Sequence, residues 1–112
     1  MSKRNEKLYI HDILEAIKNI ENYTKKISFN KFAHSQIIID AVVRNFEIIG
    51  EAAKNLSPKT KSSHSDIPWK NVLAMRNKII HEYFGVDLEI IWQTIQQDLP
   101  HLKNTVKKMS KK

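Results

Sequence analysis

The chain has 112 residues and a formal net charge of +7, with two glycines, three prolines and no cysteine. This length predicts a single domain over residues 1–112, and the missing cysteines exclude disulfides and thiolate sites. So few glycines and prolines favour long helices over a sheet with tight turns. No apolar run is long enough for a membrane span or a signal peptide, so we expect a cytoplasmic protein.

Two long helices are predicted in the first half of the chain. Apolar residues recur at spacings of three and four from Tyr9 onward, which predicts a helix over about residues 7–26. Ser28 can cap a short helical turn over 29–33. A second long helix is predicted over about 35–56, and its apolar stripe is broad enough to pack on two sides, including against a second subunit.

The second long helix also carries a row of polar residues. Asp40, Arg44, Glu47 and Glu51 follow one another at spacings of four, three and four. A solvated ladder of ion pairs explains such a row. The alternative is functional: Arg44 or Glu47 lines a cleft beside the third long helix.

A loop and a third long helix come next. Residues 56–66 are rich in Ser, Pro and Lys and keep no apolar period, so we expect a mobile or extended loop. Asp66 can cap the helix that follows, and Pro68 suits its first position because that position needs no amide donor. Gly85 is expected to end this helix.

The last predicted helix leads into a basic tail. Asp87 can cap it, and Pro100 must kink or restart it because proline cannot donate to the preceding turn. Residues 107–112 form a frayed, lysine-rich tail that holds part of the excess charge. The net charge suits a polyanion such as nucleic acid or an acidic protein partner, or it reflects largely the lysines at 103 and in this tail. Four long helices and a short one predict an all-α, antiparallel four-helix bundle.

The third helix concentrates reactive polar groups. Arg76, Asn77, His81 and Tyr83 fall within eight residues. At 100° per residue, Asn77 and His81 lie on one line and Arg76 and Tyr83 on another, while about 140° separates Arg76 from His81. Within one helix, the side chains of Arg76 and His81 are therefore not well placed to meet. Two antiparallel copies across a two-fold axis would gather two of each group around one cleft, which points to a site shared by a dimer.

These residue types suit the cleavage of RNA without a metal. His81 can act as acid or base near neutral pH, and Arg76 can grip two phosphate oxygens. Asn77 can fix the imidazole tautomer or bind a phosphate, and Tyr83 offers a hydroxyl and a ring for stacking. No cluster has metal-ligand spacing, so we expect neither metal nor cofactor. A purely structural interpretation is that these side chains tie the helices together.

The spacing of this motif resembles a known signature. Arg76-Asn77, three residues, His81-x-Tyr83 resembles the Arg-x4-His-x-Tyr signature of the HEPN superfamily, in the form found in HepT-like toxins. The resemblance extends over about residues 8–107. The flanking blocks that are also similar are 44–54, 67–69, 83–87 and 98–100.

The resemblance implies a HEPN-like bundle that forms a homodimer through the motif helix. It implies a metal-independent endoribonuclease that is the toxin of a toxin–antitoxin pair. Arg76 and His81 would be the catalytic residues and Asn77 would support them. Tyr83 would be AMPylated by a cognate minimal nucleotidyltransferase antitoxin, with which the dimer could form a larger complex.

Two other classes of function stay open. The chain could be a module that binds nucleotide or a partner without cutting RNA, and is a nucleotidyltransferase substrate through Tyr83. It could also be a structural helical adaptor. In that case, substitutions at Arg76 and His81 would change stability only.

Overall fold

The computed structural model describes residues 5–81 and 87–110, with the backbone alone described for 71, 75 and 78–81. Every element among them is helical, which confirms the predicted all-α class. In chain order the elements are α1 (Glu6–Thr24), α2 (Phe29–Ala33), α3 (Gln36–Lys54), α4 (Pro58–Ser63), α5 (Trp69–His81), α6 (Leu88–Gln93), the π-helical segment η2 (Thr94–Asp98) and α7 (Leu99–Ser110).

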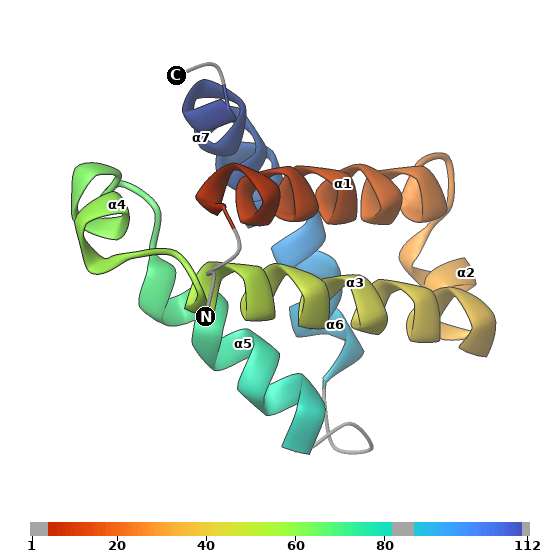
Figure 1. Cartoon of the computed structure of the whole chain (residues 1–112). Helices are drawn as coiled ribbons and strands as arrows, with labels where there is room; N and C mark the ends of the chain where they lie inside the picture. Colours follow the sequence, from red (N-terminus) through yellow and green to blue (C-terminus); the bar gives the residue numbers. More distant parts are fainter. Residues whose placement is uncertain (1–4, 82–86, 111–112) are drawn as a thin grey trace.

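The helices α1 and α3 form the centre of the fold. They lie side by side and run in opposite directions, joined by the short α2 at one end (Figure 1). Ile13, Ile17 and Ile20 of α1 and Val42 of α3 are at most 1% exposed. These residues belong to the stripes with helical spacing, so the periodicity correctly predicted which faces are buried.

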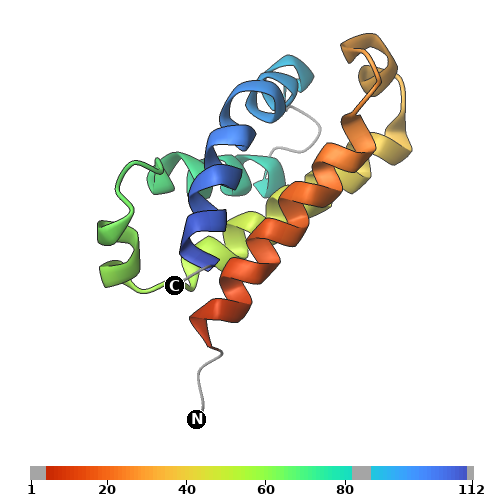
Figure 2. The same cartoon turned by 90° about the horizontal axis from the view of Figure 1, so that it is seen from above.

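The other helices pack on this central pair. α7 lies against α1, and α5 packs on α3 (Figures 1 and 2). At the α2 end, the ring of Phe32 is fully buried, with its centroid 5.3 Å from that of Trp92 of α6. Because α3 contacts both α1 and α5, it fixes where the motif helix lies. Among the described helices, none has both the length and the hydrophobicity that crossing a bilayer requires.

The expected loop over 56–66 is partly wrong, because it contains α4. Ser57 caps this helix by accepting from the amide of Thr60, and Pro58 occupies its start. The carboxylate of Glu6 on α1 accepts hydrogen bonds from Ser57 N and Thr60 Oγ1. None of the six side chains of α4 is buried, so this helix has no apolar period from which it could be predicted. Its sequence signals are the cap at Ser57 and the proline at position 58.

The start of α5 differs in detail from its prediction. The carbonyl of Pro68 accepts from the amide of Val72, so Pro68 precedes the first helical residue instead of occupying that position. The carboxylate of Asp66 accepts a hydrogen bond from Thr105 Oγ1 on α7, 3.2 Å away. It thereby connects the entry to α5 with the last helix. The predicted stop at Gly85 lies outside the described residues.

The expected kink or restart of the last helix near Pro100 takes the form of a change in helix type, because residues 94–98 are π-helical and α7 begins at Leu99. The amide of Leu99 donates to the carbonyl of Thr94, five residues earlier. Pro100 has no amide hydrogen to continue the α-helical ladder, and its ring needs space at the preceding turn. The wider η2 turn provides this space, after which α7 continues to Ser110.

Candidate functional site

The site begins at a close contact between α5 and α3. Gly50 of α3 is buried and lies against the side chain of Arg76. A Cβ atom built on Gly50 would overlap Cβ and Cγ of Arg76 and lie 3.2 Å from Cδ. The absence of a side chain at position 50 therefore lets the stem of Arg76 rest on the backbone of α3.

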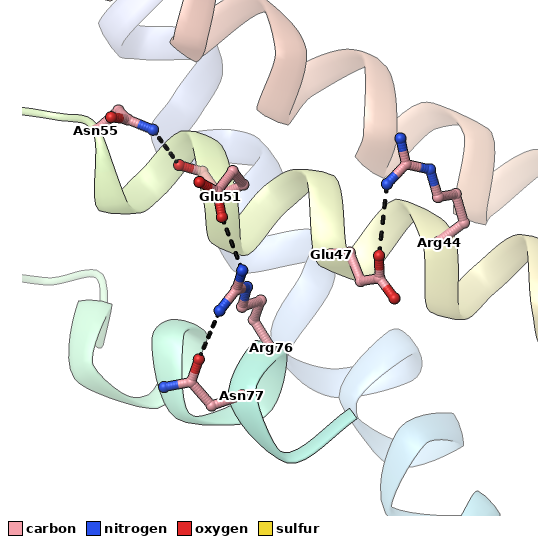
Figure 3. Close-up of polar contacts among 6 residues, drawn as sticks. All are labelled: Arg44, Glu47, Glu51, Asn55, Arg76 and Asn77. Carbon is pink, nitrogen blue, oxygen red and sulfur yellow. Dashed lines mark hydrogen bonds and ion pairs between the residues drawn. The ribbon is translucent and has the colours of Figure 1, made fainter. Parts of the chain in front are cut away.

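Two partners hold the guanidinium of Arg76. Nη2 donates to Glu51 Oε2 on α3 at 2.8 Å, and Nη1 donates to Asn77 Oδ1 at 2.9 Å (Figure 3). The Arg76 side chain is 24% exposed and that of Glu51 is 54% exposed. Nε of Arg76 is buried and has no hydrogen-bond partner among the described residues. An anionic ligand would therefore meet this arginine through its terminal nitrogens.

The turn of α3 that carries Gly50 and Glu51 is itself held in place. Asn55 caps the end of α3, and its Nδ2 donates to the carbonyl oxygen of Glu51 at 2.8 Å (Figure 3). The carboxylate of Glu51 thus projects from a capped, hydrogen-bonded helical turn. It is a fixed partner for the arginine and not a group on a free loop.

The other predicted residues of the α3 row form a separate pair. Arg44 Nη1 lies 3.4 Å from Glu47 Oε2, and the Arg44 side chain is 70% exposed (Figure 3). This contact is the kind of ion pair that the ladder interpretation describes. The cleft-lining role of Arg44 and Glu47 stays a prediction. The residue of the row that reaches Arg76 is Glu51, which was recognised in the row but not predicted as a site residue.

The structure describes less of the remaining motif residues, His81 and Tyr83. His81 is the last residue of the helix, and only its backbone is described. Five residues of α-helix place it about 7.5 Å along the axis from Arg76 and about 140° around it. Tyr83 lies outside the described residues. The catalytic role of His81 and the modification of Tyr83 therefore stay predictions.

A cavity lies apart from this polar cluster. It has a volume of about 390 Å³ and is lined by residues of α3, the start of α5, η2 and α7. Its apolar wall includes Phe46, Ile49 and Val72, and its polar wall includes Asp98 and His101. In the described part of the chain, no group of three or more His, Asp or Glu side chains is placed to hold a metal ion.

Comparisons with known proteins agree on one family. The family model described as Ribonuclease HepT-like matches residues 13–109. The probable ribonuclease HepT of Thermococcus cleftensis is 45% identical over 97% of this chain and 99% of its own length. A putative RNase of Caldanaerobacter subterraneus is 43% identical over 93% of both chains. A putative RNase of Methanocaldococcus jannaschii is 38% identical over 95% of this chain and 97% of its own. No solved structure gives a significant match.

Proposed function

This chain belongs to the HepT-like ribonuclease family, and on that basis we propose that it is a metal-independent endoribonuclease that acts on cytoplasmic RNA as the toxin of a toxin–antitoxin pair. The observation that carries the proposal is the arrangement of Arg76. Its guanidinium is oriented by Glu51 and Asn77 while its side chain stays partly exposed. A preorganised cation of this kind suits the charge that develops on a phosphorane.

The proposed reaction is a transesterification within the RNA. The 2′-oxygen attacks the adjacent phosphorus, and the bond from phosphorus to the 5′-oxygen breaks, which leaves a 2′,3′-cyclic phosphate and a 5′-hydroxyl. One proton leaves the 2′-hydroxyl and one reaches the 5′-oxygen. We assign one of these transfers to His81, and the stabilisation of the phosphoryl oxygens to Arg76. Asn77 supports this arginine through its side-chain oxygen.

We further propose that the site is composite and requires a homodimer. The angular offset between Arg76 and His81 of about 140° argues against both acting on one phosphate from a single helix. Two copies of α5 that meet across a two-fold axis would bring Arg76 of one copy and His81 of the other together in one shared cleft. In this proposal α1, α3, α5 and the α6–α7 arm correspond to the antiparallel four-helix bundle of HEPN proteins.

Control of the toxin is assigned to Tyr83. The partner is a minimal nucleotidyltransferase, which transfers AMP from ATP to the phenolic oxygen and releases pyrophosphate. The adduct adds bulk and negative charge seven residues from Arg76, where it would repel an incoming RNA phosphate. Mass spectrometry after incubation with the transferase and ATP is expected to show AMP on the wild type and none on Tyr83→Phe. An unmodified wild type would contradict this part of the proposal.

RNA cleavage in the presence of EDTA tests the nuclease proposal. Arg76→Ala and His81→Ala are each expected to lower kcat by about 10²-fold or more, because each removes a group that acts in the transition state. Lys70→Ala is a matched control, since Lys70 is an exposed cation at the start of the same helix. Full activity of both site variants would overturn the proposal.

A binding function is the second candidate. An ion pair between Arg76 and Glu51 is also expected if these two side chains only connect α5 to α3 and take no part in catalysis. A module that binds a partner or nucleotide, and presents Tyr83 to a nucleotidyltransferase, would need no catalytic arginine. In that case Arg76→Ala would lower the melting temperature, and purified wild-type protein would leave RNA intact.

A further inference from the structure

Glu51 lies at the edge of the proposed catalytic centre without belonging to the sequence motif. Its carboxylate accepts a hydrogen bond from Nη2 of Arg76 at 2.8 Å, from a different helix and 25 residues away in sequence. We infer that Glu51 is the positioning residue for Arg76. It holds the guanidinium in the orientation that meets the RNA phosphate, an inference that rests on the proposed nuclease function.

An arginine side chain needs such a restraint to act on a phosphate. It is long and has many rotamers, and a bidentate grip requires the guanidinium plane to be aligned with two oxygens. Here three contacts restrict it. The stem rests against Gly50, Nη1 is held by Asn77, and Nη2 is held by Glu51. Ordering the group before RNA binds removes a cost that would otherwise fall on the reaction.

The exposure of the pair favours orientation over stability as the role of Glu51. Its side chain is 54% exposed, and exposed ion pairs contribute little to stability because water screens them. The carboxylate nevertheless lies on a well-held turn, because Asn55 donates to the carbonyl of Glu51. A fixed carboxylate beside a partly exposed arginine sets the direction of the guanidinium at a small cost in desolvation.

The same structure contains a matched ion pair away from the motif helix. Lys103 Nζ of α7 donates to Glu21 Oε1 of α1, also at 2.8 Å, and both side chains are partly buried. Glu21→Gln therefore makes the same chemical change in a contact of equal length between two other helices. Comparing Glu21→Gln with Glu51→Gln distinguishes the effect of losing an interhelical ion pair in general from the effect of losing the pair that holds Arg76.

The test compares Glu51→Gln with Glu21→Gln in RNA cleavage and thermal unfolding. Glu51→Gln is expected to lower kcat by about 10- to 100-fold, the range for partners that orient a site residue, with KM within about threefold of the wild type. Its melting temperature should match that of Glu21→Gln, which should cleave at the wild-type rate. Glu51→Asp keeps the charge and should recover part of the lost kcat. Wild-type kcat in Glu51→Gln, or equal losses in both Gln variants, would overturn the inference.

Nitrogen NMR of the Arg76 guanidinium gives a readout that needs neither cleavage nor a folded variant. A held group in the wild type gives separate Nη resonances, and free rotation averages them. Averaged resonances in the wild type would overturn the inference. If the wild type fails to cleave RNA, the nuclease proposal fails, and this spectrum still decides whether Arg76 is held.

Discussion

Gly50 of α3 lies so close to Arg76 of α5 that a methyl group at position 50 would overlap two carbons of the arginine stem. The backbone of Gly50 does not have a positive φ, so its conformation does not require glycine. Glycine inside a helix costs about 0.5–1 kcal/mol relative to alanine. The close approach of Arg76 explains why glycine is needed at position 50 in spite of that cost.

Gly50→Ala should therefore reverse the usual effect of this substitution in a helix. Alanine would raise helix propensity, but the overlap must displace Arg76 or separate α3 from α5, and overpacking costs about 1–3 kcal/mol. We expect a melting temperature lower by several degrees and kcat lower by about tenfold or more. Thermal unfolding and RNA cleavage measure both effects.

A double-mutant cycle tests whether the overlap with Arg76 causes the loss of stability in Gly50→Ala. Because Cβ and Cγ of Arg76 are the atoms that clash, only glycine at position 76 removes both of them. Gly50→Ala should cost markedly less stability in an Arg76→Gly background than in the wild type. Equal costs in the two backgrounds would show that the contact with Arg76 is not responsible.

Asn77→Ala should weaken catalysis less than Glu51→Gln does. Asn77 Oδ1 is the partner of Nη1 of Arg76, at 2.9 Å, but it is a neutral acceptor, and hydrogen bonds between two charged groups are stronger. We expect kcat to fall by about threefold to tenfold, with little change in melting temperature because Asn77 is exposed. Asn104→Ala, at an exposed position on α7, is the control. A loss larger than that of Glu51→Gln would indicate that Asn77 contacts RNA directly.

Mixing two inactive variants tests the composite site. If each catalytic pair combines Arg76 of one protomer with His81 of the other, a heterodimer of Arg76→Ala and His81→Ala keeps one of its two pairs intact. Random exchange of subunits would then restore up to about a quarter of wild-type activity. The measurement is RNA cleavage after the two purified variants have been unfolded and refolded together. No recovery, in a mixture shown to contain heterodimer, would place both residues of a site on one chain.

Glu6 should stabilise the fold in a pH-dependent manner. Hydrogen bonds from Thr60 and Ser57 hold the pKa of the Glu6 carboxyl below its ordinary value of 4.5. A lowered pKa means that the folded state favours the ionised form. The stabilisation is therefore complete well above pH 4.5 and is lost as the pH falls through the lowered pKa.

Glu6→Gln is expected to lower the melting temperature by a few degrees at pH 7, consistent with a contribution of about 1 kcal/mol or less. The difference from the wild type should disappear as the pH falls below the lowered pKa. Glu15→Gln, at an exposed position on α1, is the control. A difference that stays constant between pH 7 and pH 3 would mean that the charge of Glu6 is not involved.

Local patterns in the sequence determined much of this protein. The spacing of apolar residues identified α1 and α3 and their buried faces, because a helix that packs on a core must repeat its apolar side chains every three or four residues. Pro100 marked the place where the last helix changes type, because proline has no amide hydrogen to donate to the preceding turn. The motif and its flanks identified the family.

Only the tertiary structure decided how Arg76 is held. Gly50 and Glu51 precede it by about 25 residues, and no periodicity relates residues on two different helices. Their contact depends on the angle and distance at which α3 and α5 cross, which the packing of the whole chain sets. The polar row on α3 was visible in the sequence, but which of its members faces α5 was not. The sequence therefore identifies the arginine, and the packing of α5 on α3 identifies Glu51 as its partner.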